Sequence, residues 1–575
     1  MSDSRNIRLG LIVLGIIPIV ILTLMGRASL STGRVQSQIP AGSIEGTVMA
    51  DGRPLPEAQV FLALTGSHQW QTRVFADDSG RFEMHGLARR AYTVMASYPG
   101  YVMDDVSEVR GYRYAGDVIT IHLARGGVVT GKVTDEDGDP VVFAHLRAIP
   151  APGEKLAGAS MNWDGAETDD RGVYRIFGLE PASYFVAVTG VGERHQGWAD
   201  DQTAIYHPSS SYDHATRVTV GRGEEAAGVD IRIRNTKGKT ISGVVLGAST
   251  QAGPKDRIEI KLLRSLTGRE EKRSAANDDG GRPSFTLSGV ADGQYLLRAL
   301  YWSDGKNQYT GSASRDITIN GKDITGADLT LAPYGYLAGR VVLEPLKESS
   351  DCKTIRPLHP EELVFTAARV RQPGTGNKSE ESADYFSPNE QGVFEIPVQG
   401  AGDFVLQAHL PERGWYLQSV ADKQVTGKST YAPFPMKSGE RRSGLTITLS
   451  PGAASFGGRV ILPGQSNQAA KQCRLLLVPA EQQLTGDLTR YVQAPVRNDG
   501  TFYFANLAPG KYRLVVLGDS DQRDDTSFLP MPISTSGMAR IQRAVAGEEI
   551  VDVKPCSRLT GFEFRPKAVP NISLK

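Results

Sequence analysis

A short sequence pattern occurs five times along this chain of 575 residues. Each copy opens with Gly-x-Val, continues with an acidic or Asn residue followed closely by Gly and an aromatic residue, and ends at a turn that enters Tyr or Phe. The openings are Gly46-Thr47-Val48, Gly131-Lys132-Val133, Gly243-Val244-Val245, Gly339-Arg340-Val341 and Gly458-Arg459-Val460. They are separated by roughly 85 to 120 residues, which is the size of a whole domain. The sequence therefore predicts a tandem array of small domains.

The second part of the pattern is typical of a β-hairpin. An Asp or Asn side chain accepts hydrogen bonds from backbone N–H groups ahead of it, Gly supplies a positive φ, and the aromatic residue starts the inner face of the next strand. A weaker version in the third copy runs from Asn277 to Phe285. The clear copies are Asp78-Ser79-Gly80-Arg81-Phe82, Asp170-Arg171-Gly172-Val173-Tyr174, Glu390-Gln391-Gly392-Val393-Phe394 and Asn498-Asp499-Gly500-Thr501-Phe502.

Apolar residues two apart follow the last aromatic residue of each copy, as in Tyr92, Val94 and Ala96. This alternation predicts half-buried strands. Strands separated by turn signals every eight to twelve residues, in units of about a hundred residues, favour β-sandwiches. We therefore expect an all-β fold of about five β-sandwich modules after one N-terminal transmembrane helix, with short joints that make a semi-stiff string.

The expected boundaries follow from these patterns. They are 1–8 for a cytoplasmic N-terminus, 9–26 for a transmembrane signal-anchor, 27–42 for a stalk, 43–124 for module 1, 125–236 for module 2, 237–333 for module 3, 334–450 for module 4 and 451–575 for module 5.

The anchor is predicted from an uncharged run of 18 residues, Leu9 to Gly26, that follows Arg5 and Arg8. This length just spans a bilayer. A cleavable signal peptide is the alternative, but its apolar part is usually shorter, and no clear Ala-x-Ala site follows the run. We expect the bulk of the chain to be exported and held at the membrane, in the periplasm or on the cell surface.

Charge and cysteine content exclude some classes of protein. Lys plus Arg equals Asp plus Glu at 64 each, with no concentrated basic block, so we expect no nucleic-acid partner. Three cysteines are too few for a disulfide framework and too scattered for zinc. Cys473 and Cys556 fall in one module and suggest a bridge, although a buried free thiol is favoured. Cys352 would be left over in either case.

No catalytic signature is complete, so we expect no enzyme, no cofactor and no metal site. His359 and Glu362 match the His-x-x-Glu spacing of two zinc ligands, but they lie in a Pro-rich insertion. His409 is the only histidine that follows them in the sequence and could act as the third ligand. The stretch from His195 through His207 to His214 gathers His and Asp residues. We interpret it as a polar loop between strands.

Two tryptophans are candidate carbohydrate-binding residues, because exposed aromatic rings stack on the apolar faces of sugar rings. Trp70 and Trp163 stand at matching positions before the hairpins of modules 1 and 2, and Trp163 lies in a polar loop. Trp198, Trp302 and Trp415 follow the Tyr or Phe strand of modules 2, 3 and 4. Packing in the core or at the rim of a sandwich is the alternative role for any of them.

The opening Gly-x-Val, the segment Asp51 to Val60, the hairpin from Asp78 to Phe82 and the later Tyr92 together resemble a carboxypeptidase regulatory-like domain. Module 2 repeats the turn as Asp135 to Pro140. The resemblance is strong in modules 1, 2 and 5 and weak in modules 3 and 4. It implies seven-stranded Greek-key sandwiches similar to transthyretin-like, starch-binding-like and carbohydrate-binding-like domains, and it carries over no catalytic residue.

With several such modules after a membrane segment, this chain resembles bacterial envelope proteins. We therefore expect a non-catalytic, membrane-anchored cell-envelope scaffold or adhesion protein with envelope or surface proteins as partners. A surface protein that binds polysaccharide through exposed aromatic residues is the alternative, and an enzyme with an unrecognised site is the third hypothesis.

Overall fold

The computed structural model describes residues 42–566 apart from several short segments. The segments left out are 66–69, 105–110, 155, 157–164, 193–200, 235, 248–254, 279–281, 306–307, 346–351, 353–354, 370–384, 412–413, 423–432, 462–473, 486, 498–499, 518–540 and 542–547. The predicted membrane segment 9–26 lies outside the described residues. Among the residues that are described, no helix is long and apolar enough to cross a bilayer.

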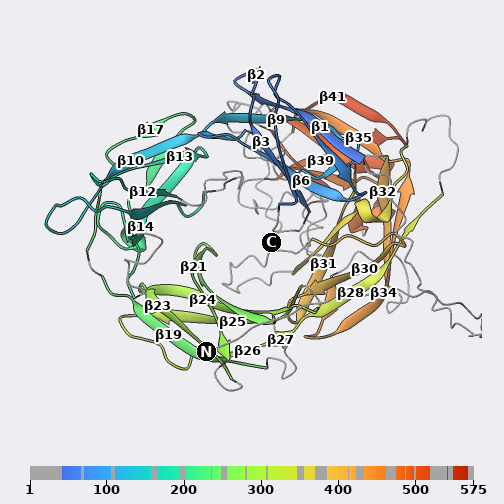
Figure 1. The fold of residues 1–575 in the computed structure, drawn as a ribbon. Coiled ribbons are helices and arrows are strands. Elements are labelled where there is room, and N and C mark those ends of the chain that lie inside the picture. Colours follow the sequence, from blue (N-terminus) through green and yellow to red (C-terminus); the bar gives the residue numbers. More distant parts are fainter. Residues whose placement is uncertain are drawn as a thin grey trace, which may run out of the picture. The chain divides into compact units, whose positions relative to one another are not determined.

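The described chain is all-β, as the alternating pattern predicted, and its strands form pairs of sheets (Figure 1). In module 1, one sheet has the order β2-β1-β9-β7 with β5 paired to β1, and the other has the order β4-β3-β6-β8. These strands are β1 (Gly42–Ala50), β2 (Arg53–Pro54), β3 (Gln59–Leu64), β4 (Thr72–Phe75), β5 (Arg81–Leu87), β6 (Ala91–Ser97), β7 (Tyr101–Met103), β8 (Arg113–Tyr114) and β9 (Val118–Arg125).

Modules 2 and 3 repeat this division into two sheets. Module 2 contains β10 (Gly127–Thr134), β11 (Ala144–Pro150), β12 (Ala166–Glu167), β13 (Val173–Leu179), β14 (Ala182–Val191), β15 (Ile205–Tyr206), the 3-10 helix η2 (Tyr212–His214), β16 (Val218–Val220), β17 (Glu225–Ala226) and β18 (Ile231–Arg232). Module 3 contains β19 (Lys239–Leu246), β20 (Arg257–Arg264), β21 (Glu270–Ala275), β22 (Asn277–Asp278), β23 (Pro283–Val290), β24 (Gly293–Ser303), β25 (Gln308–Ile319), β26 (Leu329–Thr330) and β27 (Ala332–Pro333).

Modules 4 and 5 are also pairs of sheets. Module 4 contains β28 (Gly335–Leu343), η3 (Pro360–Glu362), β29 (Val364–Arg369), β30 (Val393–Val398), β31 (Gly402–His409), β32 (Trp415–Asp422), β33 (Phe434–Met436) and β34 (Arg441–Pro451). Module 5 contains β35 (Ala454–Val460), β36 (Arg474–Pro479), η4 (Gln482–Leu484), η5 (Leu488–Arg490), β37 (Val492–Pro495), β38 (Thr501–Leu507), β39 (Gly510–Leu517), β40 (Val551–Val553) and β41 (Arg558–Phe564).

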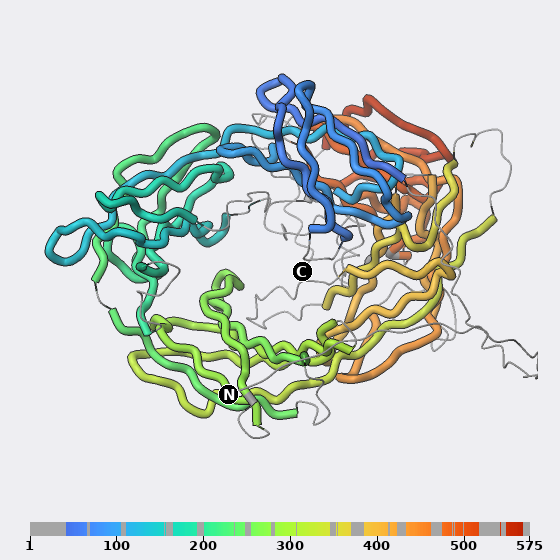
Figure 2. Tube along the Cα trace, in the orientation of Figure 1, coloured from blue at the N-terminus to red at the C-terminus, as the bar shows by residue number. Residues whose placement is uncertain are grey.

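The opening strand of each module has the same two kinds of neighbour. In module 1, β1 pairs antiparallel with β5, the strand that follows the Asp-Gly turn, and parallel with the closing strand β9. The same arrangement places β28 between β30 and β34, and β35 between β38 and β41. Although the first and last strands of a module lie side by side, each module is built from one continuous stretch of sequence, as the colours of Figure 2 show.

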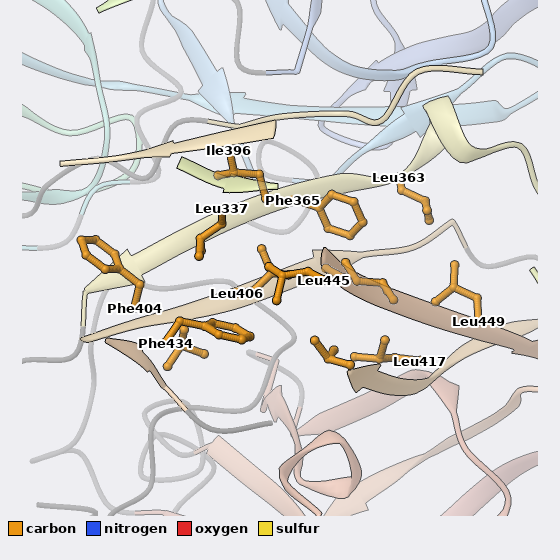
Figure 3. Close-up of a cluster of buried hydrophobic side chains, with 14 of the residues drawn as sticks. Leu337, Leu363, Phe365, Ile396, Phe404, Leu406, Leu417, Phe434, Leu445 and Leu449 are labelled. Atoms are coloured by element: carbon orange, nitrogen blue, oxygen red, sulfur yellow. The ribbon is translucent and has the colours of Figure 1, made fainter. Parts of the chain in front are cut away.

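A hydrophobic core lies between the two sheets of each module. Module 4 shows how it is made: Leu337, Ile396 and Leu445 come from one sheet, and Phe365 and Leu406 come from the other (Figure 3). The exposed fraction of each of these five side chains is 1% or less. Alternation along each strand supplies these inward side chains, because successive residues point to opposite faces of a sheet.

The glycine of Gly-x-Val is required by the close approach of the closing strand. A Cβ on Gly46 would lie 2.2 Å from the backbone oxygen of Ile119, and one on Gly458 would lie 2.0 Å from that of Phe562. The corresponding distances are 2.1 Å for Gly131 to Val229, 2.6 Å for Gly243 to Ala327 and 2.3 Å for Gly339 to Leu445. A side chain at any of these positions would push the parallel strand away.

The predicted turns form, but those of modules 1, 2 and 5 are not β-hairpins, and that part of the prediction was wrong. In module 1, β4 pairs with β3 and β5 pairs with β1, so the turn carries the chain from one sheet to the other. The capping side chain also lies one residue earlier than the acidic residue that opens the sequence pattern. Oδ1 of Asp77 accepts hydrogen bonds from the backbone N–H groups of Ser79 and Arg81, at 2.9 and 2.8 Å. Asp169 in module 2 and Asn389 in module 4 do the same with the N–H groups two and four residues ahead. The conserved geometry identifies this element as a turn.

The tyrosine at the start of the following strand makes a second repeated contact. The hydroxyl of Tyr184 donates to the backbone oxygen of Glu180 at 2.7 Å, four residues back. Tyr92, Tyr295 and Tyr512 make the equivalent bond to Ala88, Ala291 and Ala508. This is the tyrosine corner of β-sandwiches, in which a buried ring and a backbone hydrogen bond together fix the turn.

The cysteine pairing differs from the sequence-based hypotheses. Cys352 of module 4 forms a disulfide with Cys556 of module 5, whereas a bridge from Cys473 to Cys556 or free buried thiols had been expected. Cys473 lies outside the described residues. The prediction was wrong because it considered only pairs within one module, and the packing of two modules brings the Cα atoms of Cys352 and Cys556 to 5.4 Å.

Candidate functional site

The outer face of one sheet in module 1 carries exposed aromatic side chains. Val60 and Leu62 of β3 point into the core and are fully buried, so Phe61 between them points outward. Across the ladder Phe61 lies opposite Arg73, and Gln59 lies opposite Phe75. The pairing of β3 with β4 therefore places an arginine and two phenylalanines on one surface.

Trp70 joins this surface immediately before β4. The backbone N–H of the next residue, Gln71, donates to the oxygen of Leu62 at 2.8 Å, which holds the chain against β3. The ring centroids of Trp70 and Phe61 are 5.6 Å apart, with the ring planes inclined at 53°. We call Phe61, Trp70, Arg73 and Phe75 the aromatic face.

Much of the aromatic face is open to solvent. The exposed fraction is 42% for Trp70 and 56% for Phe75, whereas most large apolar side chains of the module are buried. The Arg73 guanidinium carbon lies 5.6 Å from the centroid of the Phe75 ring, within range of a cation–π contact. The arginine is thus held beside the aromatic rings with its N–H donors exposed.

This arrangement suits a flat, partly apolar ligand that carries hydrogen-bond acceptors. Aromatic rings supply large rigid contact area with few rotatable bonds, and a guanidinium donates hydrogen bonds in a fixed plane. The rings of Phe61 and Trp70 are in contact with each other, and Trp70 keeps 42% of its surface exposed for such a ligand. A sugar ring has the required flat apolar side and hydroxyl rim.

Sequence reasoning identified Trp70 and missed its three partners. The outward position of Phe61 follows from the alternation of β3 and could have been found, but the register that sets Arg73 opposite Phe61 depends on the pairing of two strands. Trp163, the other predicted site residue, lies outside the described residues, and its role stays a prediction.

Two further tryptophans have packing contacts. Trp415 is 3% exposed, and its ring N–H donates to the backbone oxygen of Arg356 at 2.9 Å. Trp302 meets Tyr309 edge to face at 5.1 Å and lies under the guanidinium of Arg257 at 4.8 Å. Their rings are engaged with the protein itself, which supports the packing role for these two.

The His-x-x-Glu pair of module 4 belongs to a short 3-10 turn. Oε2 of Glu362 accepts a hydrogen bond from the backbone N–H of His359 at 3.1 Å, so the carboxylate caps η3. Nδ1 of His359 lies 3.5 Å from a guanidinium nitrogen of Arg89. Both side chains thus take part in contacts within the protein.

The His and Asp residues near position 207 are used in local structure where they are described. Nδ1 of His207 donates to the backbone oxygen of Asp230 at 2.6 Å, and Asp201 forms an ion pair with Lys237 at 3.1 Å. Across the described ranges, no group of three or more His, Cys, Asp or Glu side chains is arranged to hold a metal ion.

The fold and the aromatic face define a class of protein, a multi-module β-sandwich protein with an exposed aromatic surface on its first module. Within it, residues 43–123 match the carboxypeptidase regulatory-like domain family. The resemblance inferred from the sequence is thereby confirmed for the first module. Comparison with curated proteins finds no match.

Solved structures similar to parts of the chain include two pilins and the Bacillus anthracis TIE protein. The Bacillus anthracis TIE protein is 12% identical, with 68% of this chain and 69% of that chain covered and a TM-score of 0.13. A minor pilin of Streptococcus agalactiae is 14% identical, with 37% and 96% covered and a TM-score of 0.18. The major pilin subunit of Bacillus cereus is 10% identical, with 57% and 100% covered and a TM-score of 0.12. Such TM-scores carry no argument about function.

Proposed function

We propose that the protein is a non-catalytic, membrane-anchored scaffold or adhesion protein of the cell envelope, built to present its modules to other envelope or surface proteins. The recurring polar and aromatic residues support this proposal, because each has a structural task. In module 2, Asp169 holds the turn before β13, Tyr174 fills the core and Tyr184 fixes the corner. The repeated motif thus maintains an architecture.

The observation that carries the proposal is the shortness of the joints between modules. β9 ends at Arg125 and β10 begins at Gly127, while β34 ends at Pro451 and β35 begins at Ala454. The N–H of Gly126 between β9 and β10 donates to the oxygen of Gly100 at 2.8 Å, so even this residue is held. Joints of this kind restrict the movement of neighbouring domains far more than a flexible linker does.

Anchoring and export are tested with the full chain carrying a C-terminal epitope in a bacterial host. We expect the chain to stay in the membrane fraction after alkaline carbonate extraction. Protease added outside the cytoplasmic membrane should remove the epitope, because the sandwiches lie beyond the 9–26 segment. Recovery of the chain in the soluble fraction, or an epitope protected until the membrane is lysed, would contradict the proposal.

Carbohydrate binding by the aromatic face is a second candidate function, favoured by the exposure of Trp70 and Phe75. The test is retention of the detergent-solubilised full chain on a panel of insoluble and immobilised polysaccharides. Trp70→Ala should remove retention without lowering the melting temperature. Phe177→Ala is a matched control, since Phe177 is 39% exposed on module 2.

The outcomes separate the two candidate functions. If the wild-type protein is retained on none of the polysaccharides, carbohydrate binding is excluded as a function and the scaffold function stands. Loss of retention together with a lower melting temperature for Trp70→Ala would assign Trp70 to packing. Equal loss in Trp70→Ala and Phe177→Ala would point to nonspecific adsorption.

A further inference from the structure

The Cys352–Cys556 disulfide stands at the joint between modules 4 and 5. The backbone N–H of Cys556 donates to the oxygen of Gly452 at 3.1 Å, and Gly452 lies between β34 and β35. The N–H of Gly452 in turn donates to the oxygen of Gly414 at 2.9 Å. The bridge therefore fastens the point at which one module passes into the next.

The segment after Cys352 is held on the same joint. Trp415 begins β32 and donates its ring N–H to the oxygen of Arg356. Ile355 also packs on the hydrophobic cluster that contains Trp415. The disulfide thus connects two backbone segments that are each already fixed to their own module.

Modules 4 and 5 also share apolar packing. A single hydrophobic cluster contains Trp415 and Leu417 of β32 together with Leu476 of β36 and Val515 of β39. Asn506 of module 5 donates its side-chain N–H to the oxygen of Leu410 in module 4 at 3.0 Å. The two modules are thus joined by a common core as well as by the covalent bond.

The positions of the two cysteines along the chain give the bridge a further consequence. Cys352 follows β28, the first strand of module 4, and Cys556 precedes β41, the last strand of module 5. The two cysteines are 204 residues apart in sequence. Every strand from β29 to β40 therefore lies inside the covalent loop, and among the described strands of modules 4 and 5 only β28 and β41 lie outside it.

From this topology we propose that the disulfide is a mechanical strap. Tension between the N-terminal end and the C-terminal end passes from β28 through the S–S bond into β41 and bypasses the strands of the loop. Residues 353–555 then cannot be extended by a pulling force, even if their packing is lost. The biological use of this strap rests on the proposed function as an anchored scaffold, which would bear load. The existence of the strap does not depend on that function.

The test is single-molecule pulling of the detergent-solubilised full chain with handles at its two termini. A covalent loop of 204 residues hides about 70 nm of extended chain, at roughly 3.5 Å per residue. We expect the fully extended oxidised chain to be shorter by this length than the chain treated with a phosphine reductant. Cys352→Ser and Cys556→Ser should each show the full length without reductant.

Cys473→Ser is the matched control, because it removes the third cysteine and should keep the hidden length. Equal extended lengths with and without reductant would overturn the strap. A hidden length of roughly 30 nm, lost in Cys473→Ser, would also overturn it, since it would assign the bridge to Cys473 and Cys556. Each result is independent of membrane anchoring, so failure of the strap and failure of the proposed scaffold are distinguishable.

Discussion

Gly46 lies directly opposite Phe82 in the antiparallel ladder between β1 and β5. A Cβ on residue 46 would lie 2.7 Å from Cζ of the Phe82 ring, so the ring covers the glycine. The same register pairs the opening glycine with the aromatic residue that follows the Gly turn in every module, as Gly131 with Tyr174, Gly243 with Phe285, Gly339 with Phe394 and Gly458 with Phe502. The opening glycine and the later aromatic residue of the repeated sequence pattern therefore contact each other in the folded module.

Gly46→Ala should destabilise module 1 by about 1–3 kcal/mol, because the methyl group must displace a backbone oxygen or the Phe82 ring. Hydrogen exchange of the full chain should show reduced protection in peptides from β1, β5 and β9. Gly305→Ala is a control, since no heavy atom lies within 4 Å of a Cβ there. Unchanged protection in Gly46→Ala would show that the closing strand can move aside at little cost.

Tyr184→Phe should lower the stability of module 2 by roughly 0.5–1.5 kcal/mol, the usual net value of one hydrogen bond. The substitution removes the bond to the Glu180 oxygen and keeps the ring. Hydrogen exchange in β13 and β14 reports the change, and Tyr184→Ala should cause a larger loss through the cavity it leaves. If the Phe variant matches wild type, packing of the ring alone fixes the corner.

The protein should lose stability at alkaline pH. Burial raises the pKa of Tyr184, Tyr174 and Tyr295 well above the ordinary value of 10.0. Between pH 10.0 and these raised pKa values the unfolded chain releases protons that the folded chain keeps, so the free energy of unfolding falls as pH rises. Denaturant titrations above pH 9 should show this fall. The free energy of unfolding should decrease less steeply with pH in Tyr184→Phe than in wild type. An equally steep decrease in that variant would contradict a contribution of Tyr184 to the alkaline loss of stability.

Asp169→Asn should make the turn before β13 in module 2 less sensitive to acid. Hydrogen bonds from the Arg171 side chain and the Val173 N–H lower the pKa of Asp169 below its ordinary 3.8. Its contribution to stability is therefore present above that value and is lost as pH falls through the lowered pKa. Asn keeps the backbone hydrogen bonds, as Asn389 does in module 4.

Calorimetry of the full chain between pH 2 and 7 checks this prediction. The Asn variant should lose less stability than wild type across the acid range. Parallel pH profiles for the two proteins would mean that the Asp169 carboxylate is not coupled to folding.

The regular parts of the fold could be predicted from local sequence. Residues such as Tyr92, Val94 and Ala96 alternate in one strand and fill one core, because the strand period of two acts over neighbouring positions. The positions of the turns were also predictable, since an Asp and a Gly a few positions apart act within the turn itself. That the two flanking strands enter different sheets, as β4 and β5 do, was not predictable from this local pattern.

The exposed aromatic face was only partly predictable. Trp70 stood out as a rare residue at a repeated position, but Arg73 and Phe75 become its neighbours through the pairing of β4 with β3. Register is set by the burial of one whole face and by the length of the connecting loop, which a local pattern does not contain.

The sequence by itself determined the all-β class, the number of repeated openings and the positions of the turns, because these depend on residues close together in the chain. Tertiary structure decided which cysteines pair and why the opening glycines are needed. Cys352 and Cys556 meet only when two modules pack, and Gly46 meets Ile119 only when the last strand of its module returns beside the first. Contacts between distant positions depend on how strands and modules assemble in space, which no short stretch of sequence specifies.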